Sequence, residues 1–178
     1  PAQIQTPELP SLPLPTEPAL PAGVPFPPSE AKAQERLHAF TKGQDAPIYR
    51  YAQRRDRIDL DATSRLSPYL RFGLLSARQA IVAAYAAIKA ATDKDAAKGA
   101  QAWLNELIWR EFYVSILYHF PHVLDRSFRA NMQDIPWEND EDSFAAWCAG
   151  STGYPIVDAA MRQLNQTSWI HNRARMIV

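Results

Sequence analysis

Apolar residues recur every three or four positions along most of the chain from Ser29 onward, which is the spacing of amphipathic α-helices. Ser29 and Ser76 stand where N-caps are expected, and Ser67 precedes Pro68, a residue favoured at the first helical position. Pro121 ends the longest of these patterns. The pattern predicts helices over residues 29–43, from residue 67 onward, and over residues 77–91, 100–120, 143–149, 155–166 and 169–178.

No segment shows convincing strand alternation, so we expect an all-α architecture with helices packed around the one that contains residues 103–113. Residues 1–28 differ, because they hold ten of the fifteen prolines and no periodic apolar pattern. We therefore expect a proline-rich, extended linker over residues 1–30 and a helical domain over residues 31–178. A linker at the start, and an apolar run without a stop signal at the end, predict that the chain is part of a longer protein.

The helix over residues 103–113 mixes aromatic, acidic and basic side chains. At about 100° per residue, Trp103, Glu106, Arg110 and Tyr113 share one side, with Trp109 at its margin. An unpaired buried charge costs several kcal/mol, so this side suits a pocket in which the charges meet a ligand or each other. The alternative is a Glu106–Arg110 ion pair on a solvated face, and the helix by itself favours neither reading.

A second group of polar residues precedes the helix predicted from residue 67. Thr63, Ser64 and Ser67 supply hydroxyl groups and Arg65 a positive charge. Together with free backbone N–H groups at a helix N-terminus, such residues suit a phosphate. The alternative is plain N-capping by Ser67.

A third group lies near the end of the chain. Trp169, Asn172, Arg173, Arg175 and Met176 fall within eight residues. Arginines and an amide beside apolar tips suit contact with the phosphates and bases of nucleic acid. An amphipathic helix with solvated arginines explains the same residues, and both readings stay open.

Composition narrows the class of protein. The 178 residues are 47% hydrophobic, which is enough to build the core of one globular domain. The charges of 19 basic and 19 acidic residues cancel, so the formal net charge is zero. A single cysteine, Cys148, excludes an internal disulfide, and neither a signal pattern nor an apolar run of about 20 residues is present, so we expect a cytoplasmic protein without membrane contact. His119 and His122 have a spacing found in metal ligands, but Pro121 breaks the helix between them. No cysteine or second cluster completes the coordination shell of a metal ion, so we expect no metal site. Rossmann, P-loop and serine-hydrolase motifs are absent.

Four blocks of sequence together resemble the flavin-binding domain of the DNA photolyase/cryptochrome family, most closely class I photolyases for cyclobutane pyrimidine dimers. The resemblance covers about residues 31–178. Its blocks are residues 51–55 with 63–67, residues 103–113, residues 152–164 and residues 169–176, in the family's order.

The resemblance implies FAD as cofactor and DNA that contains pyrimidine dimers as partner. The positions that match a binding site for U-shaped FAD are Tyr51, Thr63, Ser64, Arg65, Leu66, Ser67, Trp103, Arg110, Tyr113, Trp169, Asn172 and Arg175. Those that match the substrate site are Arg55, Asn105, Glu106, Trp109, Asn172, Arg173 and Met176. Of these, Glu106 would bond to the flipped-out dimer and Trp109 would stack on it, as a deoxyribodipyrimidine photo-lyase requires.

The implied reaction is light-driven electron transfer from reduced FAD, ring splitting and return of the electron. Trp147 matches the surface-proximal member of a tryptophan chain that photoreduces the flavin. A second, antenna chromophore would belong to a further N-terminal domain, and the protein would act as a monomer on nucleoid DNA. The alternatives are a cryptochrome-type light sensor, a (6-4) photolyase and a helical scaffold without cofactor.

Overall fold

A computed structural model of the chain describes residues 25–178, and within that range every regular element is a helix, as expected for an all-α protein. The α-helices are α1 (Glu30–Thr41), α2 (Tyr51–Arg54), α3 (Ser67–Arg71), α4 (Ala77–Ala90), α5 (Lys94–His119), α6 (Glu141–Ala149), α7 (Pro155–Thr167) and α8 (Asn172–Ile177). Three 3₁₀ helices are η1 (Pro47–Arg50), η2 (Pro121–Leu124) and η3 (Ala130–Met132). Most of the predicted linker over residues 1–30 lies outside the described residues.

Local capping signals explain two of the helix starts. Ser29 Oγ accepts a hydrogen bond from Lys32 N at 3.5 Å, and Ser76 Oγ accepts one from Gln79 N at 3.2 Å. Gln79 Oε1 in turn accepts from Ser76 N at 3.0 Å, which completes a capping box at the start of α4. The predicted N-caps Ser29 and Ser76 are therefore confirmed.

Other predicted boundaries are wrong. Ser67 is the first residue of α3 rather than its N-cap, and no side chain caps that helix. Helix α5 begins at Lys94, six residues before the predicted start, because Asp93 Oδ1 accepts from Ala96 N at 2.8 Å. Helix α8 begins only at Asn172, three residues after the predicted start.

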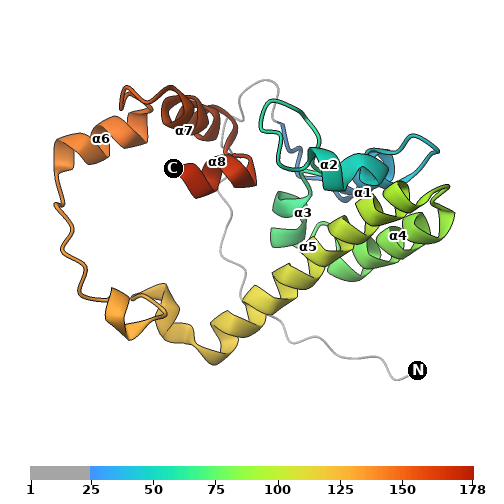
Figure 1. The fold of residues 1–178 in the computed structure, drawn as a ribbon, viewed down its shortest axis with the longest axis horizontal. Coiled ribbons are helices and arrows are strands. Elements are labelled where there is room, and N and C mark those ends of the chain that lie inside the picture. Colours follow the sequence, from blue (N-terminus) through green and yellow to red (C-terminus); the bar gives the residue numbers. More distant parts are fainter. Residues whose placement is uncertain (1–24) are drawn as a thin grey trace, which may run out of the picture.

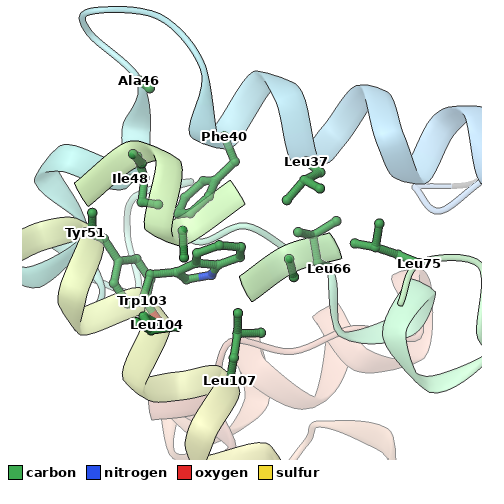
Figure 2. Packing of buried hydrophobic residues seen from close by; sticks show 14 of the residues in the cluster. Leu37, Phe40, Ala46, Ile48, Tyr51, Leu66, Leu75, Trp103, Leu104 and Leu107 are labelled. Atoms are coloured by element: carbon green, nitrogen blue, oxygen red, sulfur yellow. The ribbon is translucent and has the colours of Figure 1, made fainter. Parts of the chain in front are cut away.

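A hydrophobic core joins α1, η1, α4 and the first half of α5. Figure 2 shows the Trp103 indole between Phe40 and Leu107, and the ring centroids of Phe40 and Trp103 are 5.2 Å apart. Phe40 also meets the edge of the Tyr51 ring at 6.0 Å. A Cβ atom on Gly99 would lie 2.3 Å from the carbonyl oxygen of Tyr49, so only glycine allows α5 to approach η1 this closely.

The second half of α5 leaves this core. Its large apolar side chains are exposed, including Ile108, Phe112, Val114, Leu117 and Tyr118. Within the described residues, the expected packing of helices around this helix therefore occurs along its first half. Beyond α5 the chain turns, and α6, α7 and α8 return toward α2 and α3, as Figure 1 shows. A second, smaller hydrophobic cluster joins α7 to α8 and consists of Ala160, Ile170 and Ala174.

Candidate functional site

A hollow with a volume of about 720 Å³ lies between α5, α3 with the loop before it, and α8. Trp103, Glu106, Arg110 and Tyr113 all line it from α5. The prediction that these four residues share one side of the helix is therefore confirmed. The opposite walls carry Ser64 and Ser67 near α3, and Asn172 and Arg175 on α8.

Two smaller hollows adjoin the first. One, of about 330 Å³, lies between the loop at residues 63–67 and residues 169–175. The other, of about 110 Å³, is lined mainly by charged and polar side chains, among them Arg55, Glu106 and His171. Tyr51 and Asn172 line all three hollows, which are therefore neighbours, and together we call them the cleft. All twelve residues predicted to hold a cofactor line its two larger parts.

The loop before α3 brings a positive charge and two hydroxyl groups to this cleft. Arg65 adopts a left-handed backbone conformation with φ of 49°, and its guanidinium lies 4.6 Å from the centre of the Trp169 ring. Its Nε atom is buried 2.9 Å from Asp61 Oδ1 but makes no aligned hydrogen bond. Ser64 Oγ accepts from Trp103 Nε1 at 3.4 Å. Since Ser67 caps no helix, plain capping does not account for its hydroxyl group.

The charged side chains of α5 do not form the Glu106–Arg110 ion pair that the sequence left open. Glu106 pairs with Arg55, whereas Arg110 pairs with its neighbour Glu111. The Glu106–Arg110 pair is therefore absent, because α2 brings a competing arginine to Glu106. Burial raises the pKa of the nearby Tyr51 hydroxyl to about 12, and the negative charge of Glu106 adds to this shift. The phenol thus remains a neutral hydrogen-bond donor at physiological pH.

A buried carboxylate shapes the turn that leads into α7. Asp158 accepts from Thr152 N at 2.7 Å, from Thr152 Oγ1 at 2.6 Å and from Gly153 N at 3.1 Å. These bonds, led by that from the Thr152 hydroxyl, lower the pKa of Asp158. Residues 152–158, which begin the third block of the family resemblance, therefore orient α7 and do not line the cleft.

Polar contacts cap helix α8 and link it to the turn that follows α2. His171 is buried, and its Nδ1 atom accepts from Arg173 N at 3.0 Å, which caps α8. The Arg173 side chain reaches Asp56 Oδ1 with Nε at 2.9 Å and Nη2 at 2.8 Å. Asp56 and His171 both line the cleft, yet no local signal in the sequence identifies them as its residues.

The residues predicted to contact substrate divide into two groups. Arg55, Glu106, Asn172 and Arg173 gather in the smallest part of the cleft. Three others, Asn105, Trp109 and Met176, are exposed and line none of its parts.

The exposed members of the second group still have neighbours. The Trp109 ring meets the edge of Phe112 at 5.3 Å and lies 6.2 Å from Tyr113. Met176 Sδ lies 3.7 Å from Arg173 Nη1. An aromatic surface at Trp109 and a thioether beside Arg173 thus flank the gathered polar residues.

Trp147 lies on α6 and lines none of the three parts of the cleft. It is half-buried, stacks on Phe144 at 5.7 Å between ring centroids, and donates its indole N–H to the backbone oxygen of Val178 at 3.1 Å. Trp137, in the loop before α6, is 73% exposed and is thus the more accessible indole.

Residues 25–178 contain no group of three or more metal-type side chains close enough to hold an ion. In that same part of the chain, each helix is too short or too polar to cross a membrane.

Comparison with known proteins adds independent observations. Residues 103–178 match a family model described as the FAD binding domain of DNA photolyase. The chain is 47% identical, over 88% of its length, to the deoxyribodipyrimidine photo-lyase of Synechococcus, of which it covers 32%. It is 44% identical, over 86% of its length, to that of Thermus thermophilus, of which it covers 34%. The chain thus spans about a third of the length of these curated relatives.

Two solved structures have the same fold. A class III photolyase from Agrobacterium tumefaciens matches with a TM-score of 0.75 and 37% identity, over 84% of this chain and 30% of the other. A cryptochrome from Synechocystis matches with a TM-score of 0.75 and 29% identity, over the same shares of the two chains.

Proposed function

Because this chain belongs to the DNA photolyase/cryptochrome family, we propose that it forms part of a flavoprotein that uses light to split cyclobutane pyrimidine dimers in DNA. In this proposal residues 31–178 belong to the FAD-binding domain and residues 1–30 to a linker between domains. The observation that carries the proposal is the cleft, whose two larger parts are lined by every residue with a proposed role in cofactor binding.

The chemistry of the cleft suits FAD. Arg65, with its buried Nε lacking an aligned hydrogen bond, and the hydroxyls of Ser64 and Ser67 suit the diphosphate. In the largest of the three hollows, Tyr113 offers an exposed aromatic ring and Arg110 a hydrogen-bond donor to a ring system, and the buried Trp103 forms part of the wall. When bound, FAD supplies the light-driven electron, and the residues of this chain supply position and electrostatics.

The polar end of the cleft suits the extruded lesion. Glu106 would accept a hydrogen bond from a pyrimidine, and Arg55 keeps this carboxylate paired in the free protein. The exposed Trp109 would provide the stacking surface that offsets the cost of extruding two linked bases. Arg173 would contact the DNA backbone, and Asn172, Asn105 and Met176 would complete the mouth.

Trp147 would relay electrons toward the flavin, and its stacking on Phe144 supports a fixed ring orientation. The protein would act as a monomer in the cytoplasm on nucleoid DNA, and an antenna chromophore would bind elsewhere in the complete protein.

The second candidate function is that of a cryptochrome-type light sensor, which the Synechocystis structure favours. Glu106 with Trp109 supports repair instead, because a sensor has no need of an acid and an aromatic surface at the mouth.

Flavin content and repair in the complete protein that carries this chain test the proposal. We expect Ser64→Ala with Ser67→Ala to reduce bound flavin per folded protein, and Glu106→Gln to slow dimer splitting far more than it weakens lesion binding. Ser115→Ala, an exposed change on α5, is the matched control and should leave both unchanged. Wild-type protein that binds flavin but repairs no dimer would favour the sensor, and full flavin content in the double variant would remove the loop from the cofactor site.

A further inference from the structure

Asp56 is a charged residue of the cleft for which neither the sequence motifs nor the comparisons suggest a role. We propose that it determines specificity for damaged DNA: its carboxylate holds Arg173 in place and disfavours the binding of undamaged duplex. The inference rests on the proposed function, because it concerns the same DNA-facing end of the cleft.

The geometry places one carboxylate oxygen between two arginines. Asp56 Oδ1 lies 2.9 Å from Arg173 Nε, 2.8 Å from Arg173 Nη2 and 3.9 Å from Arg55 Nε. The third guanidinium nitrogen of Arg173, Nη1, lies 3.7 Å from Met176 Sδ. All three nitrogens of this guanidinium therefore have a neighbour, and the side chain has a defined position before DNA arrives.

The pairing joins parts of the chain that are 117 residues apart. Its side chains are 42% exposed for Arg173 and 55% for Asp56, so the pair adds little to stability. A solvent-facing ion pair that links the turn after α2 to α8 at the polar end of the cleft is thus better explained by its effect on a charged ligand than by folding.

Charge balance gives the direction of that effect. In this part of the cleft, Arg55 and Arg173 are matched by Asp56 and Glu106, so no net charge faces a DNA strand. A phosphate that contacts Arg173 must compete with the Asp56 carboxylate, which penalises every duplex. An extruded lesion gains contacts inside the cleft that undamaged DNA lacks, and it needs Arg173 in one position. Asp56 therefore lowers non-specific affinity while it preserves the specific complex.

Substitution Asp56→Asn in the complete protein tests this, with binding of lesion-bearing and undamaged duplexes of the same sequence measured at several salt concentrations. We expect affinity for undamaged duplex to rise by about twofold to fivefold and the slope of log K against log salt to steepen by about one. Affinity for the lesion should stay the same or fall, because the position of Arg173 is lost. Discrimination should decrease accordingly.

Two further variants separate this role from general effects. Asp56→Glu keeps the charge and should keep the wild-type salt slope and most of the discrimination. Asp59→Asn makes the same change of net charge in the exposed Arg57–Asp59 pair, outside the cleft, and should alter both affinities equally and slightly. Unchanged or reduced affinity of Asp56→Asn for undamaged duplex, or a rise for Asp59→Asn of the same size, would overturn the inference. Failure of the proposed function is distinguishable, because it appears as wild-type protein without preference for the lesion.

Discussion

The two sides of the cleft are stabilised in different ways. The side formed by α1, η1, α4 and the first half of α5 has a continuous core of sixteen buried residues that includes Trp103 and Tyr51. The side formed by α7 and α8 has a cluster of only three, so its own apolar burial contributes far less. On that side the hydrogen bonds of the Asp158 carboxylate and of the His171 cap hold the backbone in position.

This difference predicts different sensitivities. On the α5 side, a change of volume should be costly because close-packed atoms have nowhere to move. On the α7–α8 side, loss of a hydrogen bond or a charge should matter more than loss of a methyl group. The cleft between them combines a rigid wall that carries Trp103 with a wall whose position depends on polar contacts.

Gly99→Ala should have the largest effect on stability. The added Cβ atom would lie 2.3 Å from the Tyr49 carbonyl oxygen and 2.7 Å from that of Ile48, so α5 and η1 must separate. We expect a loss of about 3 kcal/mol in the free energy of unfolding, measured by chemical denaturation. In an open helix the same change would stabilise by up to about 1 kcal/mol, so a gain of this kind would contradict the close packing on the α5 side.

Asp158→Asn should have a smaller effect, confined to the α7–α8 side. The amide group presents a donor where Thr152 and Gly153 also donate, so the turn loses part of its bonding. Because folding lowers the pKa of Asp158, its contribution is present above pH of about 4 and is lost as pH falls through the folded pKa. Melting curves between pH 7 and pH 3 should show a lower Tm and a weaker acid dependence for the variant.

The matched control for that experiment is Asp142→Asn, because Asp142 is an exposed acid in the first turn of α6. It should keep the acid dependence of the wild type. Equal acid dependence in all three proteins would show that the turn at residues 152–158 does not rely on the Asp158 charge.

Tyr51→Phe should have the smallest effect at neutral pH, because the buried ring is kept. Since burial raises the pKa of Tyr51 to about 12, its stabilising contribution is complete below pH of about 10 and is lost as pH rises through 12. The variant should therefore lose less stability than the wild type between these pH values, by about 2 kcal/mol, as measured by denaturation. Tyr85→Phe, at an exposed position, should behave as the wild type.

Much of the fold could be predicted from the sequence because its signals are local. The capping box at Ser76 and the stop at Pro121 depend on a few neighbouring residues, and both occur as expected. Helical periodicity also placed Trp103, Glu106, Arg110 and Tyr113 on one side, and all four line the cleft. Where a local signal was ambiguous, boundaries failed: the first six residues of α5 carry no large apolar side chain, and Ser67 starts α3 without capping it.

The sequence by itself determined the helical class, most helix positions and which residues share a helix face, because these follow from interactions over a few residues. Only the tertiary structure decided the partner of each charge. Glu106 has Arg110 one turn away but pairs with Arg55, and Arg173 meets Asp56 across 117 residues. Such choices depend on which segments packing brings within a few ångströms of each other, and ion pairs are too weak to specify that packing themselves.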